Sequence, residues 1–332
     1  MRRIRIKGVN DMKEYAFGID LGGTTAKVGL FTTSGKLLEK WEVSTDTSNN
    51  GAHILENLAA AVQQKMQEKG LTVERMWNGS METLPVSATD MEHYRERPDV
   101  IFVCVKGYSL AGTIPFIKKA AKKDTVVIPV LNIYGTGAKM QKELPELLIT
   151  DGCIYVSANI KEPGVLLQHG KILRVVFGTR DKEDFREVLR EIAEDLCDSG
   201  IEGVLSENIR RDALEKFSYV SPIGAAGLYF DAVARDFQRE GEPRETFKAM
   251  IREIAALAEA MGIPFEKDMV EANLKILSNL VPEATTSMQR DVLAGKNSEI
   301  DGLVYEVVRM GAEYGVPVPV YTKVAEKLRG IK

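Results

Sequence analysis

Two continuous apolar runs constrain the fold of this chain more than any other feature. They cover residues 100–105 and 126–131, and each has the length of one strand. Strands that are apolar on both faces are typical of a parallel sheet covered by helices on both sides. A helical pattern at residues 109–121 separates the two runs, so we predict a strand–helix–strand unit. Neither run approaches the length of a membrane-spanning helix.

From residue 181 onwards the pattern becomes helical. Apolar residues recur at every third or fourth position in stripes that begin at Phe185, Phe247 and Ile300, which is the spacing of an amphipathic helix. Ser298 precedes the third stripe and predicts a capping box with Asp301. We therefore predict an α/β N-terminal half, a partial Rossmann-like parallel sheet with a β-hairpin opening, followed by an all-α C-terminal domain. Helices should fill most of residues 182–330.

The opening segment differs from both. Short apolar strands within residues 15–44 flank Gly-containing turns and predict an antiparallel hairpin or meander, with a helix after it at residues 51–69. The first turn contains Asp20, Gly22, Gly23 and Thr24. Consecutive backbone N–H groups in such a turn can form a nest that binds phosphate. Residues 12–70 resemble the N-terminal phosphate-binding hairpin of the ROK family of sugar kinases, which gives the chain a chimeric appearance.

Composition excludes several classes of function. The formal net charge is −4, so the chain lacks the basic surface expected of a protein that binds nucleic acid or an anionic membrane. Three cysteines, an odd number at wide spacing, predict reduced thiols and a cytoplasmic location. With only three histidines, we expect no His-ligated catalytic metal. No apolar region follows the basic N-terminus, so we do not interpret it as a signal peptide.

Polar residues follow both buried strands. Lys106 and Asn132 come at the carboxyl ends of parallel strands, where open α/β sheets bind ligands. Further along, Lys216 lies on a predicted helix, Ser287 begins the sequence Ser-Met-Gln-Arg-Asp, and Glu299 begins Glu-Ile-Asp. In this order and spacing, residues 71–328 resemble the ketopantoate reductase (2-dehydropantoate 2-reductase) family.

The resemblance implies a role for each of these residues. Lys216 would be the general acid that protonates the alkoxide, and Glu299 would pair with Lys216 and orient it. Asn132 would lie between nicotinamide and substrate, Lys106 would approach the cofactor, and Ser287 would hold the substrate carboxylate. The implied reaction is the NADPH-dependent reduction of a small-molecule 2-keto acid, 2-dehydropantoate to pantoate in pantothenate biosynthesis. A lysine can serve as this acid only if burial lowers its pKa.

The chain departs from the family pattern at three substrate positions. Where the family carries asparagine, this sequence has Val220, Gly224 and Ala284. Ser221 is a candidate substitute for substrate binding, although an ideal helix would point it in another direction. The identity of the 2-keto acid therefore stays open.

The sequence also contains no Gly-x-Gly-x-x-Gly turn to hold the pyrophosphate of a dinucleotide. We therefore expect weak NADPH binding, and we keep open a non-catalytic remnant and an ATP- or phosphate-binding protein of sugar-kinase type. A homodimer is a further expectation. We predict a kinase-like segment at residues 1–70, the remainder of the Rossmann-like domain at residues 71–180, and the helical domain at residues 181–332.

Overall fold

The computed structural model describes residues 15–21, 25–32, 37–44, 70–86, 89–162 and 164–331. The chain divides into two compact units. The first contains residues 1–94 and 157–171, and the second contains residues 95–156 and 172–332. The predicted domain ranges 1–70, 71–180 and 181–332 stay a prediction.

The first unit opens with an antiparallel sheet of three strands in the order β1-β2-β3. The strands are β1 (Tyr15–Leu21), β2 (Thr25–Thr32) and β3 (Leu37–Ser44). Tyr15 of β1 lies opposite Thr32 of β2, and β2 pairs with β3 in the same antiparallel sense. The predicted meander is therefore confirmed. The predicted helix at residues 51–69 lies outside the described residues.

Two further strands of this unit were not predicted. β4 (Leu71–Arg75) and β5 (Ser80–Leu84) form an antiparallel pair, and the turn between them includes Gly79 at φ +68°. A positive φ is unfavourable for residues with a side chain, so glycine suits this turn. Residues 165–168 extend the sheet by pairing in parallel with β4.

The second unit contains the predicted strand–helix–strand unit. β6 (Val100–Val103), β7 (Val126–Pro129) and β8 (Leu148–Ile149) form a parallel sheet in that order, and α2 (Leu110–Ala120) connects the first two strands. All four residues of β7 are buried. This burial on both faces explains the continuous apolar run, and the prediction is confirmed.

The chain then forms two long paired strands and returns to helix. β9 (Asp151–Glu162) pairs with β10 (Val165–Gly178). After α4 (Val188–Asp198), the short strand β11 (Glu202–Leu205) pairs in parallel with residues 174–177 of β10. β11 is the last strand in the described chain, so the predicted change to helix is confirmed.

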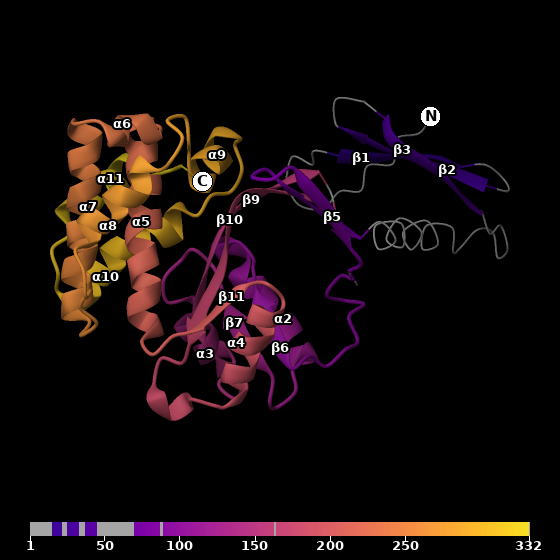
Figure 1. The fold of residues 1–332 in the computed structure, drawn as a ribbon, viewed down its shortest axis with the longest axis horizontal. Coiled ribbons are helices and arrows are strands. Elements are labelled where there is room, and N and C mark those ends of the chain that lie inside the picture. The colour runs from indigo at the N-terminus through magenta and orange to yellow at the C-terminus, as the bar shows by residue number, and fades with distance from the viewer. Residues whose placement is uncertain are drawn as a thin grey trace. The chain divides into compact units, whose positions relative to one another are not determined.

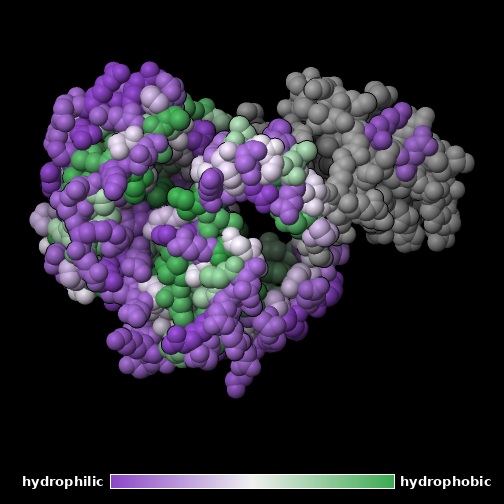
Figure 2. Space-filling model, viewed as in Figure 1, coloured by the Kyte–Doolittle hydropathy of each residue, from purple (hydrophilic) through white to green (hydrophobic). Residues whose placement is uncertain are grey.

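The rest of the second unit is a helical bundle (Figure 1). Its apolar stripes meet in one core, where Phe247, Met250 and Ile254 of α7 are fully buried against α5. In Figure 2 the outer side of the bundle is mainly hydrophilic, and hydrophobic residues show in the seams between helices. The helices are α5 (Ile209–Phe230), α6 (Ala234–Gln238), α7 (Glu242–Ala260), α8 (Met269–Ser278), α9 (Ser287–Leu293), the π-helical turn η4 (Asp301–Tyr305), α10 (Glu306–Tyr314) and α11 (Pro319–Lys327).

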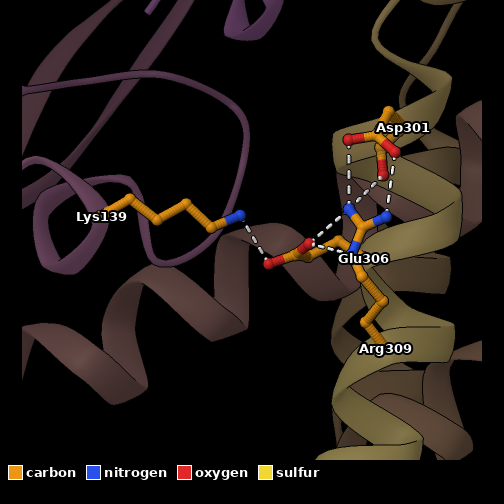
Figure 3. Close-up of polar contacts among 4 residues, drawn as sticks. All are labelled: Lys139, Asp301, Glu306 and Arg309. Atoms are coloured by element: carbon orange, nitrogen blue, oxygen red, sulfur yellow. Dashed lines mark hydrogen bonds and ion pairs between the residues drawn. The ribbon is translucent and has the colours of Figure 1, made fainter. Parts of the chain in front are cut away.

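Figure 3 shows an ionic network that connects this bundle to α3 (Thr136–Glu143), the helix after β7. The Lys139 ammonium of α3 donates to Glu306 Oε1 at 2.6 Å, and Arg309 Nε donates to the other oxygen of Glu306 at 2.7 Å. Arg309 also donates to Asp301 Oδ1 at 2.9 Å. Glu306 is only 14% exposed, so it joins two cations at the boundary between the parallel sheet and the bundle.

The predicted capping box at Ser298 is wrong. The Ser298 hydroxyl is buried and has no hydrogen-bond partner within the described chain, and no side chain caps η4. Among the described residues, no helix is long and apolar enough to cross a membrane.

Candidate active site

Lys106 lies just beyond the carboxyl end of β6 and is held by two carboxylates of the C-terminal half. Its ammonium donates to Asp291 Oδ2 at 2.9 Å and to Glu299 Oε2 at 3.1 Å. Burial alone would lower the pKa of Lys106, but the two carboxylates outweigh burial and raise it. Lys106 is therefore a fixed cation at the strand end, as the sequence predicted for its position.

Glu299 pairs with Lys106, which corrects the predicted pairing with Lys216. Its second oxygen, Oε1, accepts the backbone N–H of Gly107 at 3.1 Å, and the residue is 4% exposed. Both carboxylate oxygens are thus used by the turn that follows β6. Glu299 still acts on Lys216 through its charge, which partly offsets the lowering of that lysine's pKa by burial.

Lys216 and Asn132, to which the resemblance assigned separate roles, are in contact in the structure. Lys216 lies in the first half of α5, and its ammonium donates to Asn132 Oδ1 at 2.7 Å. Burial is the largest influence on Lys216 and lowers its pKa below the ordinary 10.5, while Cys153 and Glu299 act in the opposite direction. A buried lysine with a lowered pKa can hold a proton near neutral pH and still release it.

Tyr155 and Cys153 of β9 complete the surroundings of Lys216, and the sequence did not identify them. The Lys216 ammonium lies 5.5 Å from the centroid of the Tyr155 ring, within range of a cation–π interaction. Burial raises the pKa of Cys153 to about 11, and burial also raises the pKa of Tyr155. Alternation along β9 could have grouped residues 153 and 155 on one face, but no pattern pointed that face at Lys216.

Ile133 fixes the loop that carries Asn132. It lies against Gly107, after β6, and against Gly302 of η4. A Cβ added to Gly107 would lie 2.0 Å from Ile133 Cδ1, and one added to Gly302 would lie 2.3 Å from the same atom. Real Cβ atoms do not approach a neighbour this closely, so Ile133 would have to shift if either glycine carried a side chain.

Ser287 begins α9, where the preceding Thr286 forms a capping box with Gln289. The Thr286 hydroxyl accepts the Gln289 N–H at 3.2 Å, and Gln289 Oε1 accepts the Thr286 N–H at 2.9 Å. Ser287 itself is half-buried. Its role in holding the substrate carboxylate stays a prediction.

Ser221 is not available to a substrate, which corrects the prediction. It is fully buried, and its hydroxyl bonds to the Leu303 carbonyl and to the Tyr321 hydroxyl at 2.6 Å. Ser221 follows Lys216 by five positions, so the two side chains project about 140° apart on the helix. When Lys216 points toward Asn132, Ser221 therefore points into the helical core.

The candidate phosphate turn stays a prediction. Gly22, Gly23 and Thr24 lie outside the described residues, and Asp20 belongs to β1, where its side chain is not described. Among the residues that the structure describes, no group of three or more His, Cys, Asp and Glu side chains could hold a metal ion.

Two parts of the chain match known protein families. Residues 48–182 match the ketopantoate reductase PanE/ApbA family, and residues 208–332 match the ketopantoate reductase PanE/ApbA C-terminal family. Together the two matches cover most of the chain. The chain belongs to the ketopantoate reductase family. The predicted resemblance and enzyme class, an oxidoreductase that uses a nicotinamide cofactor, are thereby confirmed.

Members of this family are similar to the chain over most of its length. The 2-dehydropantoate 2-reductase of Aquifex aeolicus is 24% identical over 265 residues, which covers 79% of this chain and 85% of that protein. The dimeric ketopantoate reductase of Staphylococcus aureus has a TM-score of 0.68 at 19% identity, with 82% of this chain and 94% of that chain covered.

A solved dehydrogenase structure and a glucokinase are also similar to parts of the chain. A D-mandelate dehydrogenase bound to NADH and anilino(oxo)acetate has a TM-score of 0.70 at 20% identity, covering 80% of this chain and 86% of that one. The likeness to both solved structures shows the ketopantoate reductase fold. A glucokinase of Halalkalibacterium halodurans is 41% identical over 49 residues, 15% of each chain.

Proposed function

We propose that this protein reduces a 2-keto acid to the 2-hydroxy acid with NADPH, as its relatives named 2-dehydropantoate 2-reductase do with 2-dehydropantoate. The observation that carries the proposal is the hydrogen bond of 2.7 Å between the Lys216 ammonium and Asn132 Oδ1. It joins a buried proton donor on the helical domain to a residue beyond the carboxyl end of a parallel strand. That edge of an open α/β sheet is where such folds bind their ligands.

The residues at this edge fit a nicotinamide cofactor. Lys106 follows β6 and supplies a cation, and Asn132 follows β7 and keeps two amide N–H donors. These donors match a cofactor that combines phosphate groups with a polar ring. When bound, NADPH supplies the hydride that reduces the keto carbon.

Lys216 would deliver the proton. One of its three N–H groups is used by Asn132, so two remain to contact the keto oxygen. As the carbonyl oxygen gains negative charge, an N–H bond of Lys216 breaks and a new O–H bond forms. The product is a 2-hydroxy acid and Lys216 is left neutral, to be reprotonated from solvent. The role of Ser287 would be to hold the substrate carboxylate with its hydroxyl.

Glu299 and Lys106 would set the electrostatic conditions. The charge of Glu299 acts on the pKa of Lys216 in the direction opposite to burial, which would favour the protonated form of the lysine. Lys106 neutralises the same carboxylate at 3.1 Å and so limits that increase. The pair would therefore hold the pKa of Lys216 between the values that burial alone and charge alone would give.

The test is the oxidation of NADPH by the full chain with a panel of 2-keto acids, at NADPH raised to the millimolar range. We expect Lys216→Ala to lower kcat by roughly 10²- to 10⁴-fold, the usual contribution of a positioned general acid. Added ethylamine should restore part of the activity because it supplies a replacement ammonium. Lys118→Ala, at an exposed position of α2, is the matched control. Full turnover in Lys216→Ala would refute the assigned role.

We also propose that the protein acts as a homodimer, as the relative from Staphylococcus aureus does. Sedimentation velocity of the purified chain tests this, and a single species at monomer mass would contradict it. The cytoplasmic location stays a prediction.

A further inference from the structure

The Lys216 ammonium is half-buried, and no carboxylate of the described residues contacts it. Within this part of the chain its hydrogen bond goes to a neutral group, Asn132 Oδ1, at 2.7 Å. The adjacent carboxylate on α5, Glu215, accepts the Lys267 ammonium at 2.6 Å instead. A cation taken out of water needs compensating partners, so the remaining neighbours of Lys216 decide how well its charge is held.

The other ionisable groups that face Lys216 add little compensating charge. Asp212 lies one turn earlier on α5, but its Oδ2 accepts the Ser206 hydroxyl at 2.6 Å. Glu299 is already paired with the lysine that follows β6. Burial raises the pKa of the Cys153 thiol of β9 to about 11, so this group is uncharged at neutral pH.

The contact that remains is with an aromatic ring. The Lys216 ammonium lies over the ring of Tyr155, 5.5 Å from its centroid. The face of an aromatic ring carries partial negative charge and attracts a cation, more strongly where water is excluded. Burial is the largest influence on the pKa of Lys216 and lowers it. The ring therefore opposes burial without bringing a second charge to the site.

Two further strands support the Tyr155 ring. The guanidinium carbon of Arg174, on β10, lies 5.9 Å from the same ring centroid. Arg174 Nε pairs with Glu202 Oε2 at 2.7 Å, and the two residues lie opposite each other on β10 and β11. Because Glu202 neutralises Arg174, the guanidinium can pack on the ring without a net charge that would repel Lys216.

We infer that Tyr155 is a positioning residue for the proton donor, and that its aromatic face holds the Lys216 ammonium in its charged form beside Asn132. This inference rests on the proposed reduction, in which Lys216 supplies the proton. The role belongs to the ring, so the phenolic hydroxyl should be dispensable.

An NMR titration of the full chain, with lysine labelled by ¹³C at Cε, tests the inference without reliance on turnover. The Lys216 resonance is assigned by its absence in Lys216→Arg. Tyr155→Leu keeps an apolar side chain over the lysine but removes the aromatic face. We expect it to lower the midpoint of the Lys216 titration by roughly 0.4–1.5 pH units, the usual strength of a cation–π contact. Tyr155→Phe keeps the face and should titrate within about 0.3 pH units of the wild type.

Tyr229→Leu is the matched control. Tyr229 lies further along α5, about 20 Å from Lys216 along the helix axis, and the Lys327 ammonium lies 4.2 Å from its ring centroid. Its replacement removes a contact of the same kind and should leave the Lys216 midpoint unchanged. If Tyr155→Phe shifts the midpoint as far as Tyr155→Leu does, the hydroxyl and not the ring is responsible. That result, or an unchanged midpoint in Tyr155→Leu, overturns the inference.

A fluorinated ring keeps the inference testable if Tyr155→Leu does not fold. 3,5-Difluorophenylalanine at position 155 has nearly the shape of phenylalanine and a weaker negative face, so its midpoint should lie below that of Tyr155→Phe. Identical midpoints would overturn the inference. The alkaline decline of kcat/KM should move with the NMR midpoint. If the midpoints shift as expected but the wild-type chain reduces no 2-keto acid, the ring contact is supported and the proposed function fails.

Discussion

Gly302→Ala should strain the loop that carries Asn132. The added Cβ would lie 2.3 Å from Ile133 Cδ1, 2.6 Å from Cγ1 and 3.0 Å from Cγ2. Because both branches of the isoleucine are affected, a change of rotamer cannot clear all three contacts and the backbone of the loop must move. Overpacking of this kind costs about 1–3 kcal/mol, and the helix gains about 0.5–1 kcal/mol when alanine replaces glycine. The difference between these figures is a net loss of about 0–2.5 kcal/mol, and we expect about 1 kcal/mol.

Gly107→Ala provides a contrast at the other side of the same side chain. Its Cβ would lie 2.0 Å from Ile133 Cδ1 but 3.4 Å from Cγ1, so the severe contact involves one methyl group. Ile133→Val removes that methyl group and should relieve Gly107→Ala almost completely. The same valine keeps both γ carbons, so Gly302→Ala should need Ile133→Ala for full relief.

Urea denaturation followed by far-UV circular dichroism measures these costs in the full chain. Circular dichroism reports the helices of the second unit, whereas both tryptophans, Trp41 and Trp77, belong to the first unit. We expect a coupling free energy of about 1–2 kcal/mol between Gly107→Ala and Ile133→Val. If the changes in unfolding free energy of the two variants add within about 0.5 kcal/mol, as they do for independent sites, the packing of Ile133 between Gly107 and Gly302 is refuted.

Three further predictions follow from the site and its supports. The rate of reduction should fall as pH rises through the pKa of Lys216, because only the ammonium form donates a proton. The midpoint of this decline in a pH–rate profile should lie below the ordinary 10.5. A midpoint at or above 10.5 would contradict a buried donor. Ser287→Ala should raise KM for the 2-keto acid about tenfold with little change in kcat, since it removes one hydrogen bond to a charged group; steady-state kinetics measure both, and an unchanged KM would remove Ser287 from the substrate site. Glu306→Gln should lower the free energy of unfolding by about 1 kcal/mol at neutral pH. Burial would raise the pKa of Glu306, but Lys139 and Arg309 outweigh burial and lower the pKa below 4.5. The loss of unfolding free energy in Glu306→Gln should therefore vanish as pH falls through that lowered pKa. A loss that does not change with pH in urea titrations would contradict the network.

The sequence predicted the elements whose pattern is local. Residues 100–105 and 126–131 were recognisable as buried parallel strands because each is apolar on both faces. Lys106 and Asn132 were recognisable as ligand-binding candidates because they directly follow those strands. The helical stripes, such as the one at Phe247, were recognisable because a 3.6-residue period needs no knowledge of the partner helix.

Side-chain pairing across the chain was beyond the sequence. Glu299 is 193 positions from Lys106, and nothing in its neighbourhood distinguishes a carboxylate that binds Lys106 from one that binds Lys216. Ser298 fits a capping pattern, yet its hydroxyl has no hydrogen-bond partner within the described chain, and the neighbouring Glu299 bonds to the turn after β6. Tyr155 is an ordinary aromatic residue of a strand until α5 brings Lys216 to within 5.5 Å of its ring.

Transfer of deuterium from NADPH labelled at C4 of the nicotinamide to C2 of the 2-hydroxy acid tests the central claim most directly. Mass spectrometry of the product detects the label without reliance on tight cofactor binding. We predict a product heavier by one mass unit with the wild-type chain and 2-dehydropantoate, and roughly 10²- to 10⁴-fold less of it per unit time with Lys216→Ala. A product without deuterium, or no product from any 2-keto acid at millimolar NADPH, would contradict the assignment of hydride transfer to this chain.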